Sequence, residues 1–326
     1  MKEKIIINAR IIDPSQNMDE KGSVIIDSKG KIKDIGKNIK RKDFPPSSDV
    51  IDINNKILIP GLADMKAFVG EPGFEYKENF RTLSNAALSG GVTSIVTMPD
   101  TKPVIDNVSM VDFIIRRGRD KASVNLFPCA SLTKQMEGIL MTEFGLLSAR
   151  GIIGFTDVKK TVQNTETMAR IMNYASDLGV LIMQHAEDYE LSKNGCINEG
   201  EISNRLGLQG ISSIAEKIII ERDLTLLEDF NCRYHISQIS SQKSLEVIKK
   251  RKEIVKFTCG VSINNLSLNE NDIGDFKTFL KLSPPLRTEE DRLALVEGIK
   301  KGLIDVIVSD HRPEDEESKR LPFAQA

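Results

Sequence analysis

The sequence predicts an α/β fold, a (β/α)8 barrel of the TIM type flanked by a small β unit. From about residue 57 onward, short apolar runs alternate with amphipathic helical patterns, which is typical of strands and helices that build a parallel sheet. The apolar runs are numerous enough for the eight strands that close such a barrel. Residues 1–56 instead show β-rich runs without a helical period. We therefore expect two domains, at 1–56 and 57–326.

The β unit at the start of the chain consists of short runs at 5–7, 23–26 and 31–35, separated by glycine and proline residues. The third run mixes charged and apolar residues, as a half-exposed strand does. This pattern predicts a small antiparallel β unit. A separate all-β domain is the alternative, and it is disfavoured because the unit runs directly into the next apolar run.

The first β/α unit of the barrel is expected between residues 57 and 100. The apolar run 57–62 predicts a buried strand, and residues 64–68 stand at its carboxyl end. A glycine-containing turn then leads into a helical pattern at 76–89 and a second strand at 93–98. Because the carboxyl ends of barrel strands face the active site, we expect residues 64–68 to line that site.

Strands and helices continue to alternate beyond residue 100. The expected helices include 165–178 and 213–229. The remaining barrel strands are expected at 124–129, 151–156, 180–184, 232–237, 254–259 and 305–309.

The sequence stops at Ala326, directly after the last expected strand and its loop. A barrel needs an eighth helix to cover that strand, and no residues remain for one. We therefore expect a barrel that is incomplete at its C-terminal end because the sequence is a fragment or an incomplete gene product. The alternative is that a partner chain covers the gap.

The amino-acid composition argues against several classes of protein. The 326 residues are enough to bury a sizeable core, and 45 basic against 47 acidic residues give a formal charge of -2. This balance gives no electrostatic reason to expect binding to nucleic acid or to an anionic membrane. Four single cysteines without CxxC spacing argue against a zinc finger or a disulfide framework. The N-terminal apolar run is too short for a signal peptide, so we expect a cytoplasmic protein.

The three histidines all fall at the ends of expected strands. His185 follows the run 180–184, His235 lies in the run 232–237 and His311 follows the last strand. A lone histidine beside an apolar run is more often a structural residue than a metal ligand. Because all three stand at strand ends of one barrel, the pattern favours a present or former metal site.

Two stretches carry a resemblance to a known family. PGLADMKAFVGEPGFEYKE at 60–78 and GGVTSIVTMPDTKPVIDN at 90–107 resemble the first two β/α units of dihydroorotases, which are metal-dependent amidohydrolases. The family text is PGLVDMHVHLREPGFEYKE and GGFTTVVAMPNTNPVIDN. The resemblance implies an amidohydrolase barrel, and it makes residues 1–56 the N-terminal part of the flanking β-sandwich.

The departures from the family text fall on the metal ligands. By the resemblance, one metal ion is bound by a His-x-His pair and an Asp on the last strand, and here the pair is Lys66 and Phe68 while Asp310 is kept. The second ion keeps more of its ligands. Its histidines are His185 and His235, and Asp157 is the candidate bridging carboxylate. We therefore expect at most one zinc ion.

Substrate positions also depart from the family pattern. The Arg that binds the substrate carboxylate is Gly70 in this sequence, and the final His of the family's Asp-His-Ala-Pro-His is Glu314. Two substrate Asn positions are Asp100 and Ser283, which remain candidates for substrate binding. A bidentate charged contact is lost at position 70.

Two hypotheses remain from the sequence. In the first, the chain is a catalytically silent dihydroorotase homologue that acts as an oligomeric assembly partner of aspartate carbamoyltransferase, as the resemblance to non-catalytic dihydroorotase-like subunits implies. In the second, it is an active amidohydrolase that interconverts carbamoyl aspartate and dihydroorotate. This enzyme would hold one zinc on Asp157, His185 and His235, with Asp310 as acid and base. The missing pair at 66 and 68 favours the first.

Overall fold

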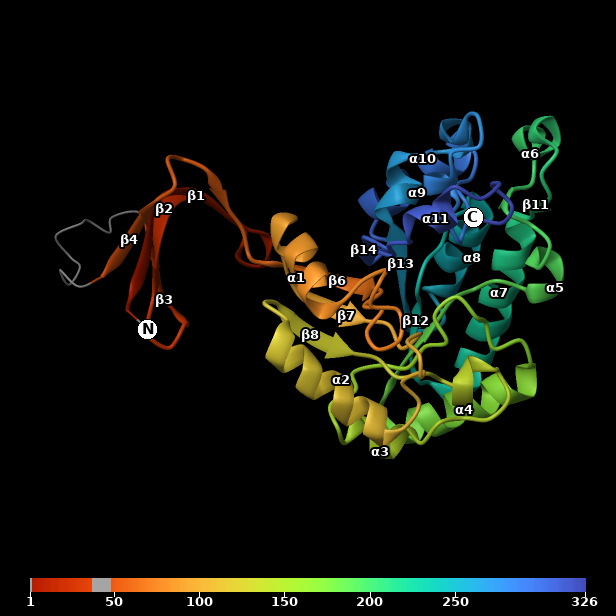
Figure 1. Ribbon diagram of the computed structural model, residues 1–326, viewed down its shortest axis with the longest axis horizontal. Coiled ribbons are helices and arrows are strands. Elements are labelled where there is room, and N and C mark those ends of the chain that lie inside the picture. The colour runs from red at the N-terminus through yellow and green to blue at the C-terminus, as the bar shows by residue number, and fades with distance from the viewer. Residues whose placement is uncertain (1, 37–47) are drawn as a thin grey trace. The chain divides into compact units, whose positions relative to one another are not determined.

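The chain folds into two compact units, Met1–Leu62 and Ala63–Ala326, in a computed structural model that describes residues 2–36 and 48–326 (Figure 1). The second unit has the strand and helix alternation of the expected barrel. The division between the units falls a few residues later than the expected boundary at 56/57.

The first unit is a five-stranded sheet with β1 at its centre. β2 pairs antiparallel with β1, and β3 pairs antiparallel with β2, but β4 and β5 run parallel to β1. The prediction of an antiparallel unit was therefore only partly correct, because β4 and β5 run in the same direction as β1. The strands are β1 (Lys4–Asp13), β2 (Met18–Ile26), β3 (Ile32–Gly36), β4 (Asp49–Asp52) and β5 (Ile57–Leu58).

The prediction of a buried barrel strand at 57–62 was wrong. Ile57 pairs with Arg10 of β1 and its side chain is exposed, so this run closes the first unit. Pro60 and Gly61 interrupt the run, because proline lacks a backbone donor and glycine adds backbone freedom. The first barrel strand is instead β6 (Leu62–Ala67), which begins after them. Residues 64 and 66 therefore lie within the strand.

The barrel strands form two sheets with joints between them. One sheet has the order β6-β7-β8, and the other has the order β9-β12-β13-β14. The pairs from β7 to β8 and from β9 through β12 and β13 to β14 are parallel. The strands after β6 are β7 (Val92–Thr97), β8 (Asn125–Pro128), β9 (Leu181–Gln184), β12 (Arg233–Ile236), β13 (Thr258–Ser262) and β14 (Val306–Val308).

Isolated bridges join the two sheets into a closed ring. On one side Phe155 bridges both Ala130, just beyond β8, and Ile182 of β9, so the fourth strand predicted at 151–156 is reduced to a short extended segment. On the other side Ala67 of β6 bridges His311, just beyond β14. The eight-stranded barrel is therefore present, although three of its joints depend on single bridges.

Helices pack on the outside of these strands, as Figure 1 shows for α1, α2, α4 and α7. The prediction of a helix at 165–178 was confirmed by α4, and that at 213–229 by α7. Side-chain caps fix several starts, such as the amide oxygen of Asn79 on the first turn of α1. The longer helices are α1 (Phe80–Ser89), α2 (Val108–Lys121), α4 (Thr165–Leu178), α7 (Ser213–Phe230), α8 (Gln242–Arg251) and α10 (Glu289–Lys300).

Shorter elements fill the loops, mostly after the strands. The short helices are α3 (Phe144–Ser148), α5 (Tyr189–Ser192), α6 (Glu201–Leu206), α9 (Ile263–Ser267) and α11 (Glu316–Lys319), and the two-residue strands β10 (Ile197–Asn198) and β11 (Gly210–Ile211) pair with each other. No helix in residues 2–36 or 48–326 is both long enough and apolar enough to cross a membrane.

The main core lies between the strands and the helices. Phe80, Phe144 and Phe155 are fully buried there, and the last two rings lie 4.3 Å apart between centroids. Burial of each such side chain contributes about 1.5–3 kcal/mol to folding. The interior of the barrel is apolar at one level, with Met98 and Met183 packed together. Polar side chains gather above this layer, at the carboxyl ends of the strands.

Candidate active site

Lys66 is buried inside the barrel, where the family pattern has a metal-binding histidine. Lys66 is only 5% exposed, and its ammonium nitrogen Nζ lies 3.1 Å from Oδ1 of Asp310. The same nitrogen donates a hydrogen bond to the side-chain oxygen of Gln238, which follows β12. A lysine at this depth needs such partners, because burial of an unpaired charge is very costly.

Asp310 reaches Lys66 from the loop that follows β14. Its backbone has φ of 53°, in the left-handed region that Asp tolerates better than most residues. The preceding Ser309 is anchored by its backbone amide and hydroxyl, which both donate to the carboxylate of Asp64. β6 and the residues after β14 therefore hold the Asp310 carboxylate beside the Lys66 ammonium.

Phe68 and Asp100 are both engaged by Arg312. The Arg312 guanidinium carbon lies 4.6 Å from the centroid of the Phe68 ring, within the range of a cation–π contact. Its Nη1 forms an ion pair with Oδ2 of Asp100 at 2.5 Å. Asp100, a predicted substrate-binding residue, thus has a partner from the chain itself.

Gly70 adopts a conformation that a side chain would strain. Its φ is +69°, and a Cβ atom there would lie 2.5 Å from the backbone oxygen of Glu78 and 2.8 Å from that of Phe74. These are contacts with backbone atoms, which cannot rotate away. The backbone of this loop therefore leaves room only for glycine at position 70. An arginine there does not fit without backbone movement.

We expect Gly70→Ala to destabilise the protein by at least about 2 kcal/mol, because left-handed strain and a backbone clash add together. Gly207→Ala is the matched control, since Gly207 has φ of +64° and nothing within 4 Å of its added Cβ. That variant should lose only about 1 kcal/mol. Urea unfolding of both measures the difference. Equal losses for the two variants would show that the Gly70 loop moves freely.

His235 projects from β12 and is nearly fully buried. Its Nδ1 lies 2.8 Å from the Thr258 hydroxyl oxygen. Burial lowers the pKa of His235 to about 4, opposed by attraction to Asp305 and reinforced by repulsion from Lys66. The imidazole is therefore neutral at physiological pH, with Lys66 close enough to disfavour any added positive charge.

His185 lies beyond the end of β9 and contacts different groups. Its Nε2 is 3.4 Å from the hydroxyl oxygen of Ser283 and 3.8 Å from a carboxylate oxygen of Glu187. Its Nδ1 is buried and has no hydrogen-bond partner among the described residues. The two predicted site residues His185 and Ser283 are therefore brought together.

Asp157 is held by Thr133. One carboxylate oxygen accepts from the Thr133 amide at 3.1 Å, and the other accepts from its hydroxyl at 2.5 Å. Burial raises the pKa of Asp157 to about 6, although the hydrogen bonds from Thr133 lower it. Both oxygens therefore accept a hydrogen bond from Thr133, which fixes the orientation of the carboxylate.

These positions test whether a metal ion fits. Across residues 2–36 and 48–326, no group of three or more His, Cys, Asp or Glu side chains is placed to hold one. The predicted set of Asp157, His185 and His235 is not among such groups. A buried ammonium on Asp310 adds repulsion against a cation. The residues present do not fit a zinc site.

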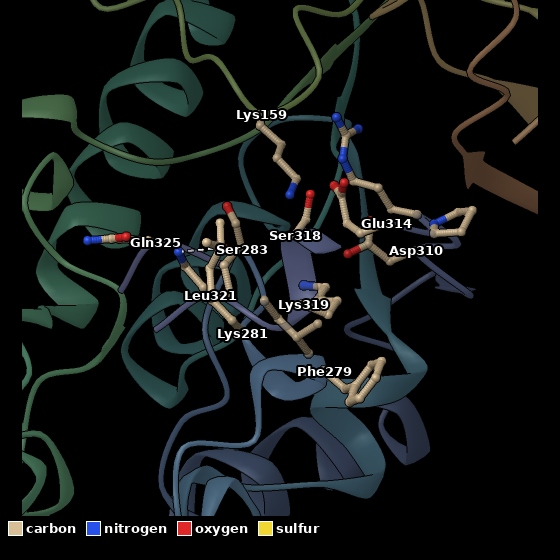
Figure 2. Close-up of a pocket in the computed structure, with 14 residues that line it drawn as sticks. Lys159, Phe279, Lys281, Ser283, Asp310, Glu314, Ser318, Lys319, Leu321 and Gln325 are labelled. Atoms are coloured by element: carbon tan, nitrogen blue, oxygen red, sulfur yellow. Dashed lines mark hydrogen bonds between the residues drawn. The ribbon is translucent and has the colours of Figure 1, made fainter. Parts of the chain in front are cut away.

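A cavity of about 540 Å³ opens at the carboxyl ends of the strands (Figure 2). Lys159, Ser283 and Asp310 line it, and Figure 2 shows Lys159 extending toward the same space as Asp310. Desolvation of the ammonium lowers the pKa of Lys159 to about 8, and repulsion from Arg312 adds to this shift. Glu314 also lines the cavity, where it pairs with Lys77.

Sequence reasoning missed Arg312, Lys159 and Gln238. A signal existed only for Arg312, which stands where the family's Asp-His-Ala-Pro-His has alanine. An added guanidinium at a strand end is a change in charge that could have been noted. Lys159 and Gln238 follow strands without any family motif to mark them.

The fold is similar to that of solved hydantoinases. The structure of L-hydantoinase (dihydropyrimidinase) from Arthrobacter aurescens matches with a TM-score of 0.84 at 20% identity, covering 100% of this chain and 72% of that one. A D-hydantoinase (dihydropyrimidinase) from a Thermus species matches with a TM-score of 0.77 at 21% identity, over 99% and 72% of the two chains. At these identities the likeness concerns the fold.

The chain belongs to the dihydroorotase family. A family model described as dihydro-orotase-like matches residues 55–244. The dihydroorotase of Ehrlichia chaffeensis is 44% identical, covering 98% of this chain and 72% of that protein. The dihydroorotase of Syntrophus aciditrophicus is 38% identical over 99% and 76% of the two chains. The resemblance noted in the sequence is thereby confirmed.

Proposed function

We propose that this chain is a dihydroorotase-family protein of de novo pyrimidine biosynthesis with little or no catalysis, acting as an assembly partner of aspartate carbamoyltransferase. The observation that carries the proposal is the buried ion pair between Lys66 and Asp310. It joins a residue at a metal-ligand position to the residue expected to act as acid and base.

The chemistry of amide hydrolysis explains why this pair matters. Zinc or a similar ion lowers the pKa of a bound water to about 7 and polarises the carbonyl group. A protonated lysine has no lone pair with which to bind such an ion. Asp310 is paired with Lys66 rather than directed at a water and a substrate. The site therefore offers neither a set of ligands for a metal ion that could activate a water as the nucleophile nor a free base.

The alternative is an active enzyme that uses a single zinc ion. The names of the relatives favour it, since proteins 36% to 44% identical to this chain are called dihydroorotases. The geometry argues against it, because Asp157, His185 and His235 form no group placed to hold a metal ion, and the Lys66 ammonium lies beside Asp310. Loss of the substrate Arg at Gly70 adds to this argument.

The assembly role rests on what the fold keeps. The core side chains are buried although the chemical positions have changed, and Pro72 and Gly73 still form the turn after β6. A chain that keeps its fold after losing its catalytic residues is expected to use its surface to bind a partner. We place the protein in the cytoplasm as part of an oligomer, and its four buried free cysteines are consistent with that compartment.

Co-expression with aspartate carbamoyltransferase followed by size-exclusion chromatography tests the assembly role. We expect the two proteins to elute together at micromolar concentration, through an interface that buries more than ~1,000 Å². Each protein run alone is the control for its own elution volume. Separate elution of two well-folded proteins would contradict the proposed partnership.

A further inference from the structure

The barrel closes between β6 and the residues after β14 with little backbone pairing. Ala67 and His311 form a single isolated bridge there. The backbone amide of Phe68 donates to the carbonyl oxygen of His311 at 2.9 Å. By contrast, β9 and β12 pair over several residues of regular ladder. The first and last strands of the barrel therefore need other contacts to stay together.

Side chains supply those contacts across this seam. Five polar residues between 309 and 314, just after β14, pair with residues that lie in β6 or in the loops after β6 and β7. The pairs are Ser309 with Asp64, Asp310 with Lys66, His311 with Glu78, Arg312 with Asp100 and Glu314 with Lys77.

We propose that the Lys66 ammonium is a built-in cation that joins the first and last strands of the barrel, in the structural role that a metal ion has when ligands from both strands share it. Lys66 donates to Gln238 as well as pairing with Asp310, so one charged group links β6 with segments after β12 and β14. We call Lys66, Asp310 and Gln238 the Lys66 clasp.

Depth distinguishes the clasp from the other ion pairs of the seam. The side chains of Lys66 and Asp310 are 6% and 13% exposed, whereas those of Lys77 and Glu314 are 21% and 24% exposed. A deeper pair is less screened by solvent, and removal of one partner leaves the other charge buried. Lys66 should therefore matter more to barrel closure than Lys77 does.

The clasp also predicts how the protein responds to metal. A divalent ion bound by Asp310 would have to displace the ammonium or lie beside it, and like charges at short range repel. The barrel should thus fold and stay closed without any metal. This inference concerns closure of the barrel, so it can hold or fail independently of assembly with a partner.

Thermal unfolding of single and double variants tests the clasp. Lys66→Met should lower the Tm by roughly 5–10 °C. It should also speed amide hydrogen exchange in 62–67 and 306–311 at least about tenfold. Lys77→Met is the matched control, with the same charge change at the rim of the same seam, and it should shift the Tm by less than about 3 °C.

The double variant Lys66→Met with Asp310→Asn separates charge from packing. Because it removes both charges, it should regain most of the Tm that Lys66→Met loses. If Lys66→Met does not fold, the same comparison is made between Asp310→Asn and the double variant, and Asp310→Asn alone should be the less stable. No regain in the double variant would overturn the ion-pair account.

Metal dependence of the fold is tested on the wild-type chain. We expect less than one zinc per ten chains after purification, and a Tm that changes by less than about 2 °C with EDTA or with added zinc. A Tm that falls by several degrees with EDTA, together with stoichiometric zinc, would show that a metal ion holds the barrel and would overturn the proposal.

Discussion

Replacing Arg287 by methionine is expected to destabilise the barrel by about 3–5 kcal/mol, because it breaks a buried charged network. Arg287 is 3% exposed and donates to Asn198 Oδ1 at 2.8 Å and to the Ile211 carbonyl oxygen at 2.6 Å. Its Nε donates to the Ser240 hydroxyl, which itself donates to Glu216. The variant leaves these acceptors and the Glu216 charge buried without their cation.

Urea unfolding measures this loss, with Arg320→Met as the control. Arg320 forms an exposed ion pair with Glu316 one helical turn away, so its replacement should change stability by less than about 0.5 kcal/mol. The loss expected for Arg287→Met is larger than that for Arg320→Met because Arg287 is buried and Arg320 is exposed. A loss below about 1 kcal/mol for Arg287→Met would mean that water reaches the network and replaces the guanidinium.

Local patterns of the sequence were sufficient to predict most of the barrel. Helix α4 begins after Asn164, which caps its first turn, and ends at Gly179 with φ of 65°. Both signals are local, so sequence alone reveals them. The apolar run at 57–62 misled for the opposite reason. Whether such a run enters the barrel or closes the first sheet depends on its pairing with β1, which is a long-range contact.

The site was harder to predict because its contacts join distant parts of the chain. The strand ends that carry His185, His235 and Asp310 could be found from the apolar runs. Their partners could not, since the Arg312–Asp100 pair spans 212 residues of sequence and the Lys66–Gln238 bond spans 172. Motif comparison showed that ligands at 66 and 68 were missing. It did not show that an ammonium would pair with the carboxylate that remained.

The second large effect concerns catalysis. We expect turnover of dihydroorotate by the purified protein to be indistinguishable from the uncatalysed background, and so far below the ~1 per second at the lower end of ordinary enzymes. Lys66 pairs with the expected acid and base Asp310, and Asp157, His185 and His235 form no group placed to hold a metal ion. A restored arginine at position 70 should not recover activity, because Gly70 cannot accept a side chain without backbone movement.

The dihydroorotate hydrolysis assay is the most direct test of a silent dihydroorotase-family barrel. It should be run with and without added zinc, beside the 44% identical dihydroorotase of Ehrlichia chaffeensis as the positive control. The account predicts background rates for this chain under both conditions while the control turns over. A rate between roughly 1 and 1,000 per second that depends on zinc would contradict it.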